Sequence, residues 1–204
     1  MREIDRAQFL RLGVASMTTA GAAALLPTVA AAGPPTPTPI GDDIGFVQFG
    51  AVGERAALAF YRKALARSGA FSAEERRRLD EARRAKRTYV ERLNAVLGPD
   101  AVTSTDFGVE FAKSSTASRR ALLALGRRLE GLLVGVYLYG VGYAADPATR
   151  LLLGDLLAVD AQHLAVLRRM DGGAAVSGFP GARDVESAGD ELDSVLVTPN
   201  SPNA

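Results

Sequence analysis

One stretch of the chain, residues 151–170, places two ionisable side chains inside the apolar stripe of a helix. Apolar residues recur in it at spacings of three and four, the pattern of an amphipathic helix that faces a bundle core. Asp160 and His163 take two successive positions of this stripe, one turn apart and on one face. His163 is the only histidine in the chain. The stretch therefore raises the question of which polar groups other helices bring to meet these two.

The composition favours a single helical domain. The 204 residues suffice for one domain with a proper core. Hydrophobic residues make up 48% and aromatic residues 6%, without tryptophan, which suits helices packed through small residues better than a β-sandwich. A formal net charge of +1 gives no case for nucleic-acid binding. The lack of cysteine excludes disulfides, thiolate metal sites and thiol catalysis.

The first 32 residues read as an export signal. A weakly apolar run rich in Ala, Gly and Thr ends in Ala30–Ala32, a small-residue cleavage pattern. The segment Arg6–Leu10 is similar to a twin-arginine signal, although Ala7 stands where the second arginine would be. Pro27 and the Gly and Thr content argue against a stable membrane span. We expect removal of residues 1–32 and a periplasmic, cell-envelope or extracellular location.

Two flanking segments are predicted on either side of the helical domain, which we place at residues 43–173. Residues 33–42 form a proline-rich, extended linker without chemistry of its own. Residues 174–204 form a C-terminal tail that is expected to be partly disordered. Within it, Val195–Val197 can dock on the domain, whereas the residues from Pro199 onward are expected to fray.

Four helices are predicted within the domain, and their start signals are clear. Asp43 is the expected N-cap of the first, Ser72 and Glu75 form a capping box for the second, and Asp146 precedes a first-turn proline in the fourth. The predicted helices cover roughly residues 43–68, 72–97, 118–145 and 147–170. One short loop joins the first helix to the second, and another joins the third helix to the fourth. The connection between the second and third helices can span roughly 60 Å when extended, long enough to cross the whole bundle.

Each predicted helix carries an acidic or lysine residue in the middle of its apolar stripe, and the fourth helix carries His163 in addition. The acidic and lysine residues are Glu54, Lys86, Glu130 and Asp160. Glu54 and Lys86 lie at matching distances from the tight loop between their helices, and the other two residues are placed likewise around theirs. In antiparallel hairpins such residues meet at one level. The sequence therefore predicts a buried polar layer at mid-bundle.

The outer face of the second helix is crowded with arginines. Acidic residues at helical spacing accompany them. We interpret this face as solvated and ion-paired, not as a nucleic-acid surface, because stacking aromatic residues are missing.

Several motifs resemble the ferritin-like domain family of exported bacterial proteins, which is related to plant desiccation-related proteins. The motifs are Phe60-Tyr61-Arg62-Lys63-Ala64-Leu65 with Glu54 before it, Leu129-Glu130, Gly135-Val136-Tyr137-Leu138-Tyr139-Gly140, and Leu157-Ala158-Val159-Asp160-Ala161-Gln162-His163. The resemblance covers roughly residues 43–172. It implies an all-α, antiparallel four-helix bundle with one long crossover between the second and third helices.

The resemblance also implies a di-metal carboxylate site made from six positions. Glu54, Glu130, Asp160 and His163 stand at four of them, with Asp-x-x-His in place of the family's Glu-x-x-His. Lys86 and Tyr89 stand at the other two, where the family has Glu and His. The lysine places a positive charge where a metal ion would be, and at about 4 Å two such charges repel by several kcal/mol.

These substitutions favour a metal-free core and leave a metal site as the alternative. In the first case no cofactor is bound, Lys86 and a protonated His163 offset the carboxylates, and Tyr89 donates a hydrogen bond to Glu54 or Glu130. In the second case one iron or manganese ion binds Glu130, Asp160 and His163, as suits mixed oxygen and imidazole ligands. A working di-iron oxidoreductase is the least favoured reading.

The functional hypotheses follow from these alternatives. The leading one is a non-catalytic, exported protein with a structural or stress-related role. The second is a metal-binding redox protein that uses the residual half-site. The third is a cell-envelope scaffold that forms a homodimer, or binds an envelope protein, through the glycine-rich face of the third helix.

Overall fold

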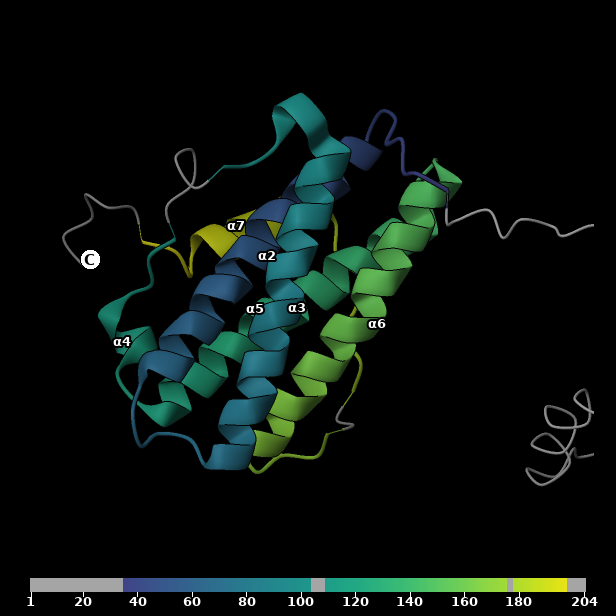
Figure 1. Ribbon diagram of the computed structural model, residues 1–204. Coiled ribbons are helices and arrows are strands. Elements are labelled where there is room, and N and C mark those ends of the chain that lie inside the picture. Colours follow the sequence, from purple (N-terminus) through teal and green to yellow (C-terminus); the bar gives the residue numbers. More distant parts are fainter. Residues whose placement is uncertain (1–34, 104–108, 176–177, 198–204) are drawn as a thin grey trace, which may run out of the picture. The chain divides into compact units, whose positions relative to one another are not determined.

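A computed structural model describes residues 35–103, 109–175 and 178–197, and the regular elements in this part of the chain are all helices (Figure 1). The predicted all-α bundle is confirmed. The four long helices are α2 (Asp43–Ala66), α3 (Ala73–Leu97), α5 (Arg119–Tyr143) and α6 (Pro147–Met170). The shorter ones are η1 (Gly98–Asp100), α4 (Lys113–Thr116) and α7 (Val185–Asp193). The predicted export signal lies outside the described residues.

The long helices form two antiparallel hairpins that pack against each other. A short loop joins α2 to α3 and another joins α5 to α6, while α2 and α5 make the contact between the hairpins (Figure 1). The long connection from α3 to α5 is the predicted crossover, and it contains η1 and α4. Of the neighbouring pairs of long helices, α3 and α6 make the sparsest contact. No helix among the described residues is both long and apolar enough to cross a membrane.

Local sequence signals set the helix starts, with one exception. Ser72 and Glu75 form the predicted reciprocal capping box of α3, and Asp146 caps α6 by accepting a hydrogen bond from the backbone N–H of Thr149. The prediction for Asp43 is wrong, because Asp42 is the N-cap of α2. The buried Asp43 carboxylate instead accepts from the backbone N–H groups of Ala145 and Asp146, both at 2.8 Å. It thereby fastens the start of α2 to the loop between α5 and α6.

Glycines on α5 allow close approach of aromatic and aliphatic side chains from the neighbouring helices. A Cβ atom at Gly126 would lie 2.3 Å from the ring of Phe60 on α2, and one at Gly140 would lie 2.6 Å from Leu153 on α6. Gly131, by contrast, has open space at its Cβ position. Some of the α5 glycines are therefore required for close packing of the helices, and others are not.

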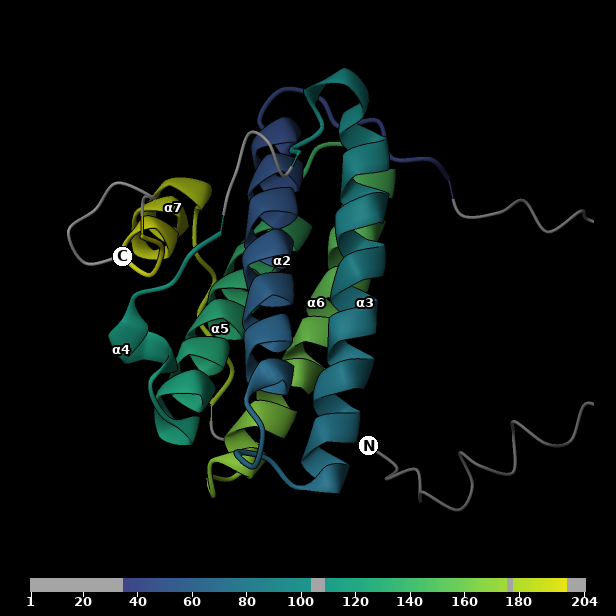
Figure 2. The ribbon, with the colours of Figure 1, turned by 60° about the vertical axis from the view of Figure 1, so that its left-hand side comes forward.

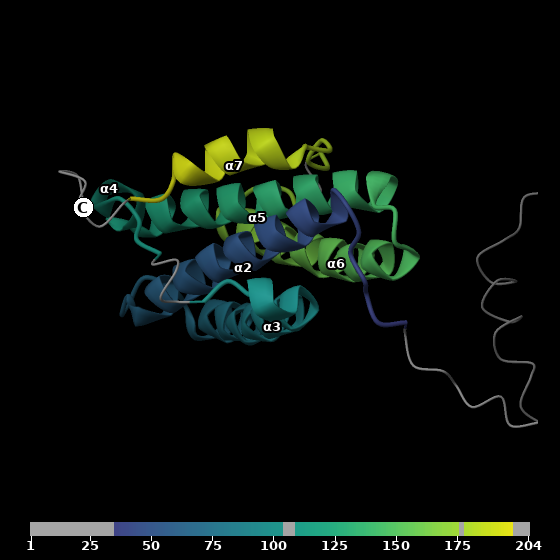
Figure 3. The ribbon, with the colours of Figure 1, turned by 90° about the horizontal axis from the view of Figure 1, so that it is seen from above.

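The C-terminal segment forms a helix, α7, that the sequence did not predict. It lies on the outside of α5 and beside α2 (Figures 2 and 3). Ala188 and Leu192 are buried there, and Arg128 on α5 donates to Glu191 at 3.0 Å. The segment after α7 docks as expected, since Val195 is buried and Leu196 pairs with Phe111 of the crossover.

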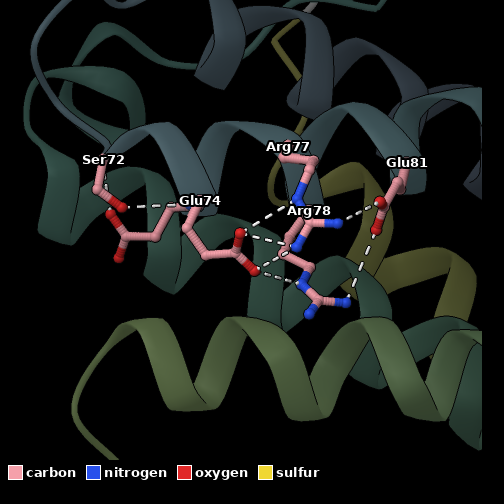
Figure 4. Close-up of polar contacts among 6 residues, drawn as sticks. Ser72, Glu74, Arg77, Arg78 and Glu81 are labelled. Carbon is pink, nitrogen blue, oxygen red and sulfur yellow. Dashed lines mark hydrogen bonds and ion pairs between the residues drawn. The ribbon is translucent and has the colours of Figure 1, made fainter.

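The arginine-rich face of α3 is exposed and ion-paired, as predicted (Figure 4). Arg77 and Arg78 both bond to Glu74, at 2.7 and 3.0 Å, and both approach Glu81. These side chains are roughly half exposed or more, so each pair contributes little to stability.

Candidate metal centre

Four helices bring their central ionisable residues together in the core. Glu54 on α2, Lys86 on α3, Glu130 on α5 and Asp160 on α6 are all fully buried, with no exposed surface. The predicted polar layer at mid-bundle is therefore present. It forms because each residue lies in the apolar stripe of its helix, and the tight loops of the two hairpins set the register.

The lysine lies at the centre of this group. Lys86 Nζ is 2.6 Å from Asp160 Oδ1 and 2.9 Å from both Glu54 Oε2 and Glu130 Oε2. An ammonium group carries three N–H donors and here meets three carboxylates. A buried charge is tolerated only when it is paired in this way. Lys86 thus supplies a positive charge at the centre of the three carboxylates.

Two buried tyrosines complete the cluster, and sequence reasoning did not assign them this role. Tyr61 on α2 donates to Glu130 Oε1 at 2.7 Å, and Tyr137 on α5 donates to Glu54 Oε1 at 3.0 Å. Each tyrosine follows the glutamate of its own helix by two turns and bonds to the glutamate of the other. This reciprocal pattern follows from the antiparallel packing of α2 and α5. The hydroxyl donor expected from Tyr89 is not seen, because within the described residues Tyr89 bonds to neither glutamate.

Burial and mutual repulsion shift the pKa values of the cluster. Burial, then the Asp160 charge, raises the pKa of Glu54 well above its ordinary value. Burial likewise raises the pKa of Asp160 to about 6, against the opposing effect of Lys86. Burial alone would lower the pKa of Lys86, but the carboxylates of Asp160, Glu130 and Glu54 outweigh it, and the net shift is well upward. Burial thus favours the protonated forms of Glu54 and Asp160, whereas the surrounding carboxylates favour the charged form of Lys86.

His163 lies at the edge of the cluster without joining its hydrogen bonds. Its Nδ1 atom is 3.7 Å from both Glu130 Oε1 and Asp160 Oδ1, too far for a hydrogen bond, and it has no partner among the described residues. Burial lowers its pKa, although the Glu130 charge acts in the opposite direction. The expected protonated His163 is therefore disfavoured.

A pocket between α3 and α6 leads from the surface to His163. Its volume is about 160 Å³, and its lining includes Tyr61, Leu79, Ala82, Gln162 and His163. The pocket occupies the side of the bundle where the two helices contact each other least. The edge of the buried cluster is thus within reach of water.

The residues present do not fit a di-metal centre. Lys86 and Tyr89 stand at two of the six ligand positions, and the ammonium contacts all three remaining carboxylates. Glu130, Asp160 and His163 still offer three donor atoms within 4.8 Å of one another, a set that suits one iron or manganese ion. An ion there would share Asp160 and Glu130 with the ammonium of Lys86.

The fold and this layer define the class of protein: a four-helix bundle with one long crossover and ionisable groups from all four helices at its centre. The model of the ferritin-like domain family matches residues 42–172, and the chain belongs to that family. Comparisons with curated proteins and with solved structures gave no significant match.

Proposed function

We propose that this protein is an exported, non-catalytic member of the ferritin-like domain family in which a buried lysine replaces the metal ions. The observation that carries the proposal is the position of Lys86 Nζ, 2.6 to 2.9 Å from three carboxylates. The ammonium balances part of the negative charge that metal ions would otherwise balance. It also repels a further cation, by about 4 kcal/mol for unit charges about 4 Å apart at an effective dielectric of 20.

The proposed role is structural or stress-related, in the cell envelope or outside the cell. The N-terminal pattern of residues 1–32 supports export, and the resemblance to desiccation-related proteins supports a role under stress. Fractionation of the producing cells tests the first part: the mature chain should begin after residue 32 and be absent from the cytoplasm. Survival of a deletion strain after drying tests the second, and survival equal to that of the parent would contradict it.

Metal analysis of the purified protein tests the central claim. The protein isolated from its native compartment should hold far less than one iron or manganese ion per chain. A near-stoichiometric ion that is lost in His163→Ala would overturn the proposal. The double variant Lys86→Glu, Tyr89→His is the matched comparison, since it restores the six-ligand set and should bind two ions.

The residual ligand set favours one other function, a redox protein with a single metal ion. His163 Nδ1 is buried without a hydrogen bond, and it faces two carboxylate oxygens at 3.7 Å. Titration with ferrous or manganous ion separates the two functions. Tight binding of one equivalent by the wild type, abolished in His163→Gln, would favour the redox protein.

A homodimer or envelope partner remains a proposal as well. The glycine-rich face of α5 was the surface expected to contact the partner. At Gly135, however, this face is already covered by Gly181 and Arg183 of the same chain. Sedimentation at high concentration measures the oligomeric state, and a strictly monomeric mass would exclude the homodimer.

A further inference from the structure

One end of the bundle carries exposed basic side chains without partners. This basic end, the lower one in Figure 2, contains the first turns of α3 and α5 and the last turn of α6, which Arg119 joins by bonding to Glu75 and to the carbonyl oxygen of Met170. Its acidic residues Glu74, Glu75 and Asp171 are already paired with arginines. Exposed basic residues here that form no ion pair within the described part of the chain include Arg62, Lys63, Arg120 and Arg169.

The opposite end of the bundle has the opposite charge. This acidic end, the upper one in Figure 2, contains the start of α2, the end of α3 and the loop from α5 to α6. Its arginines Arg92 and Arg150 are already bonded within the chain. Exposed carboxylates here that have no ion-pair partner among residues 35–103, 109–175 and 178–197 include Asp42, Glu91 and Asp100.

Large apolar side chains are also exposed at the acidic end. Tyr143, the last residue of α5, is 69% exposed and stacks on Tyr139, with 4.3 Å between the ring centroids. The other exposed large apolar residues of this end are Leu151, Ile40 and Ile44. Elsewhere in the described part of the chain only Phe179 belongs to this class. Apolar side chains that gather on one surface mark an interaction site.

The basic end contains a groove that suits such a side chain. The groove lies between the start of α3 and the end of α6, has a volume of about 250 Å³, and is lined by Val166 and Met170 together with Arg78 and Arg169. Nearly all of its exposed lining is apolar, since the arginines contribute their stems as well. A guanidinium group beside an aromatic ring is also attractive. The groove therefore fits an apolar or aromatic side chain that is surrounded by carboxylates.

The two ends are complementary but cannot meet within one chain. Leu151 and Met170 lie near opposite ends of α6, roughly 28 Å apart along the helix axis. We propose that the basic end binds the acidic end of a second copy of this chain, head to tail, with an exposed apolar side chain such as Tyr143 in the groove. A contact between two different surfaces leaves one end of each kind free, so further copies can add.

A second copy is the partner that accounts for both ends. An anionic membrane would engage the basic end and leave the apolar side chains of the acidic end uncovered. Opposite charges orient two copies before contact, and burial of apolar surface then stabilises the complex. The contact involves neither Lys86 nor a metal ion. This proposal and the proposed function can therefore fail separately.

Sedimentation equilibrium of the purified protein tests the proposal. The average mass should rise with protein concentration beyond the mass of a dimer. Raising the salt concentration from about 0.01 M to about 1 M shortens the range of charge interactions from about 30 Å to about 3 Å, and the association should weaken at least about tenfold. The mass of a single chain at a protein concentration of about 1 mM, or an association that salt does not change, would overturn the proposal.

Two variants distinguish a head-to-tail contact from any other. Lys63→Gln, Arg120→Gln, Arg169→Gln disables the basic end, and Asp42→Asn, Asp100→Asn, Tyr143→Ser disables the acidic end. All six residues are exposed, so both variants should fold. Each alone should stay monomeric, whereas an equimolar mixture should form a 1:1 complex and nothing larger. Arg87→Gln removes an exposed charge at mid-bundle and should associate as the wild type does.

Three outcomes would contradict the head-to-tail contact. Association of either variant alone as in the wild type would place the contact on another surface, such as α5. A mixture that stays monomeric would show that the two ends do not bind each other. A monomeric wild type that sediments with phosphatidylglycerol vesicles, while the variant of the basic end does not, would make an anionic membrane the partner of that end.

Discussion

The Tyr61 hydroxyl group on α2 donates a hydrogen bond to Glu130 on α5 at 2.7 Å, and both side chains are buried. Its counterpart is the bond from Tyr137 to Glu54, which runs between the same two helices in the opposite direction. The two bonds orient both glutamates so that their other oxygens face Lys86. The tyrosines therefore hold the carboxylates in place around the ammonium.

Removing either hydroxyl should destabilise the bundle. Tyr61→Phe and Tyr137→Phe each leave a buried carboxylate oxygen without its donor, and hydrogen bonds to charged groups contribute about 1.5–3 kcal/mol. Urea unfolding measures the loss. Tyr143→Phe is the control, because Tyr143 is 69% exposed and its change should fall within about 0.5 kcal/mol of the wild type. Equal stability of all three variants would show that the buried hydroxyls are not needed.

Replacing Lys86, the central cation, should destabilise the bundle more than removal of a tyrosine hydroxyl group does. Lys86→Met leaves Glu54, Glu130 and Asp160 buried without a positive charge, and breaking a buried ion pair in this way typically costs about 3–5 kcal/mol. Lowering the pH should return part of this stability, because protonation neutralises the carboxylates. Denaturant unfolding at two pH values measures both effects. Arg87→Met on the exposed face of α3 is the control. A Lys86→Met protein as stable as the wild type at neutral pH would contradict the account of the cluster.

The polar layer could be predicted from the sequence because the position of the layer depends only on helical periodicity and on the length of two loops. Helical periodicity places an acidic or lysine residue in each apolar stripe, and the one tight loop of each hairpin fixes the register between its two helices. That Lys86 stands in place of a metal ligand was implied by the resemblance to the ferritin-like domain family, not by the periodicity. Helix start signals and loop lengths indicated four helices with one long connection, and the family resemblance implied the same fold class and crossover.

The tyrosine donors and α7 could not be predicted in this way. Tyr61 and Tyr137 occupy stripe positions where an aromatic ring simply fills the core, and the sequence does not say which carboxylate a hydroxyl group reaches. Tyr89, one turn from Lys86, was the more obvious choice, yet it lies at the rim of the bundle, only half buried. α7 is a short acidic helix whose stability comes from packing on α2 and α5, and short helices carry weak local signals.

The glycines of α5 offer a test of packing that is independent of the cluster. Gly126→Ala would place a Cβ atom 2.3 Å from the buried ring of Phe60, and overpacking of this kind typically costs about 1–3 kcal/mol. Gly131→Ala meets no atom within 4 Å and should stabilise α5 by up to about 1 kcal/mol through helix propensity. Thermal unfolding of both variants should therefore shift in opposite directions. A shift of both in the same direction would contradict the close approach of α2 and α5 at Gly126.

His163 should make the stability of the bundle depend on pH in a direction set by its lowered pKa. A histidine whose pKa is lower when folded than when unfolded contributes stability above about pH 6.5, and this contribution is lost as the pH falls through the folded value. The raised pKa values of Glu54 and Asp160 change the stability with pH in the opposite direction. Both residues are present in the wild type and in His163→Gln, so their effect is shared by the two proteins. As the pH falls from about 7.5 to about 5.5, the free energy of unfolding of the wild type should therefore decrease relative to that of His163→Gln. Because the chain has no other histidine, a difference that does not change over this range would mean that His163 keeps an ordinary pKa beside the cluster.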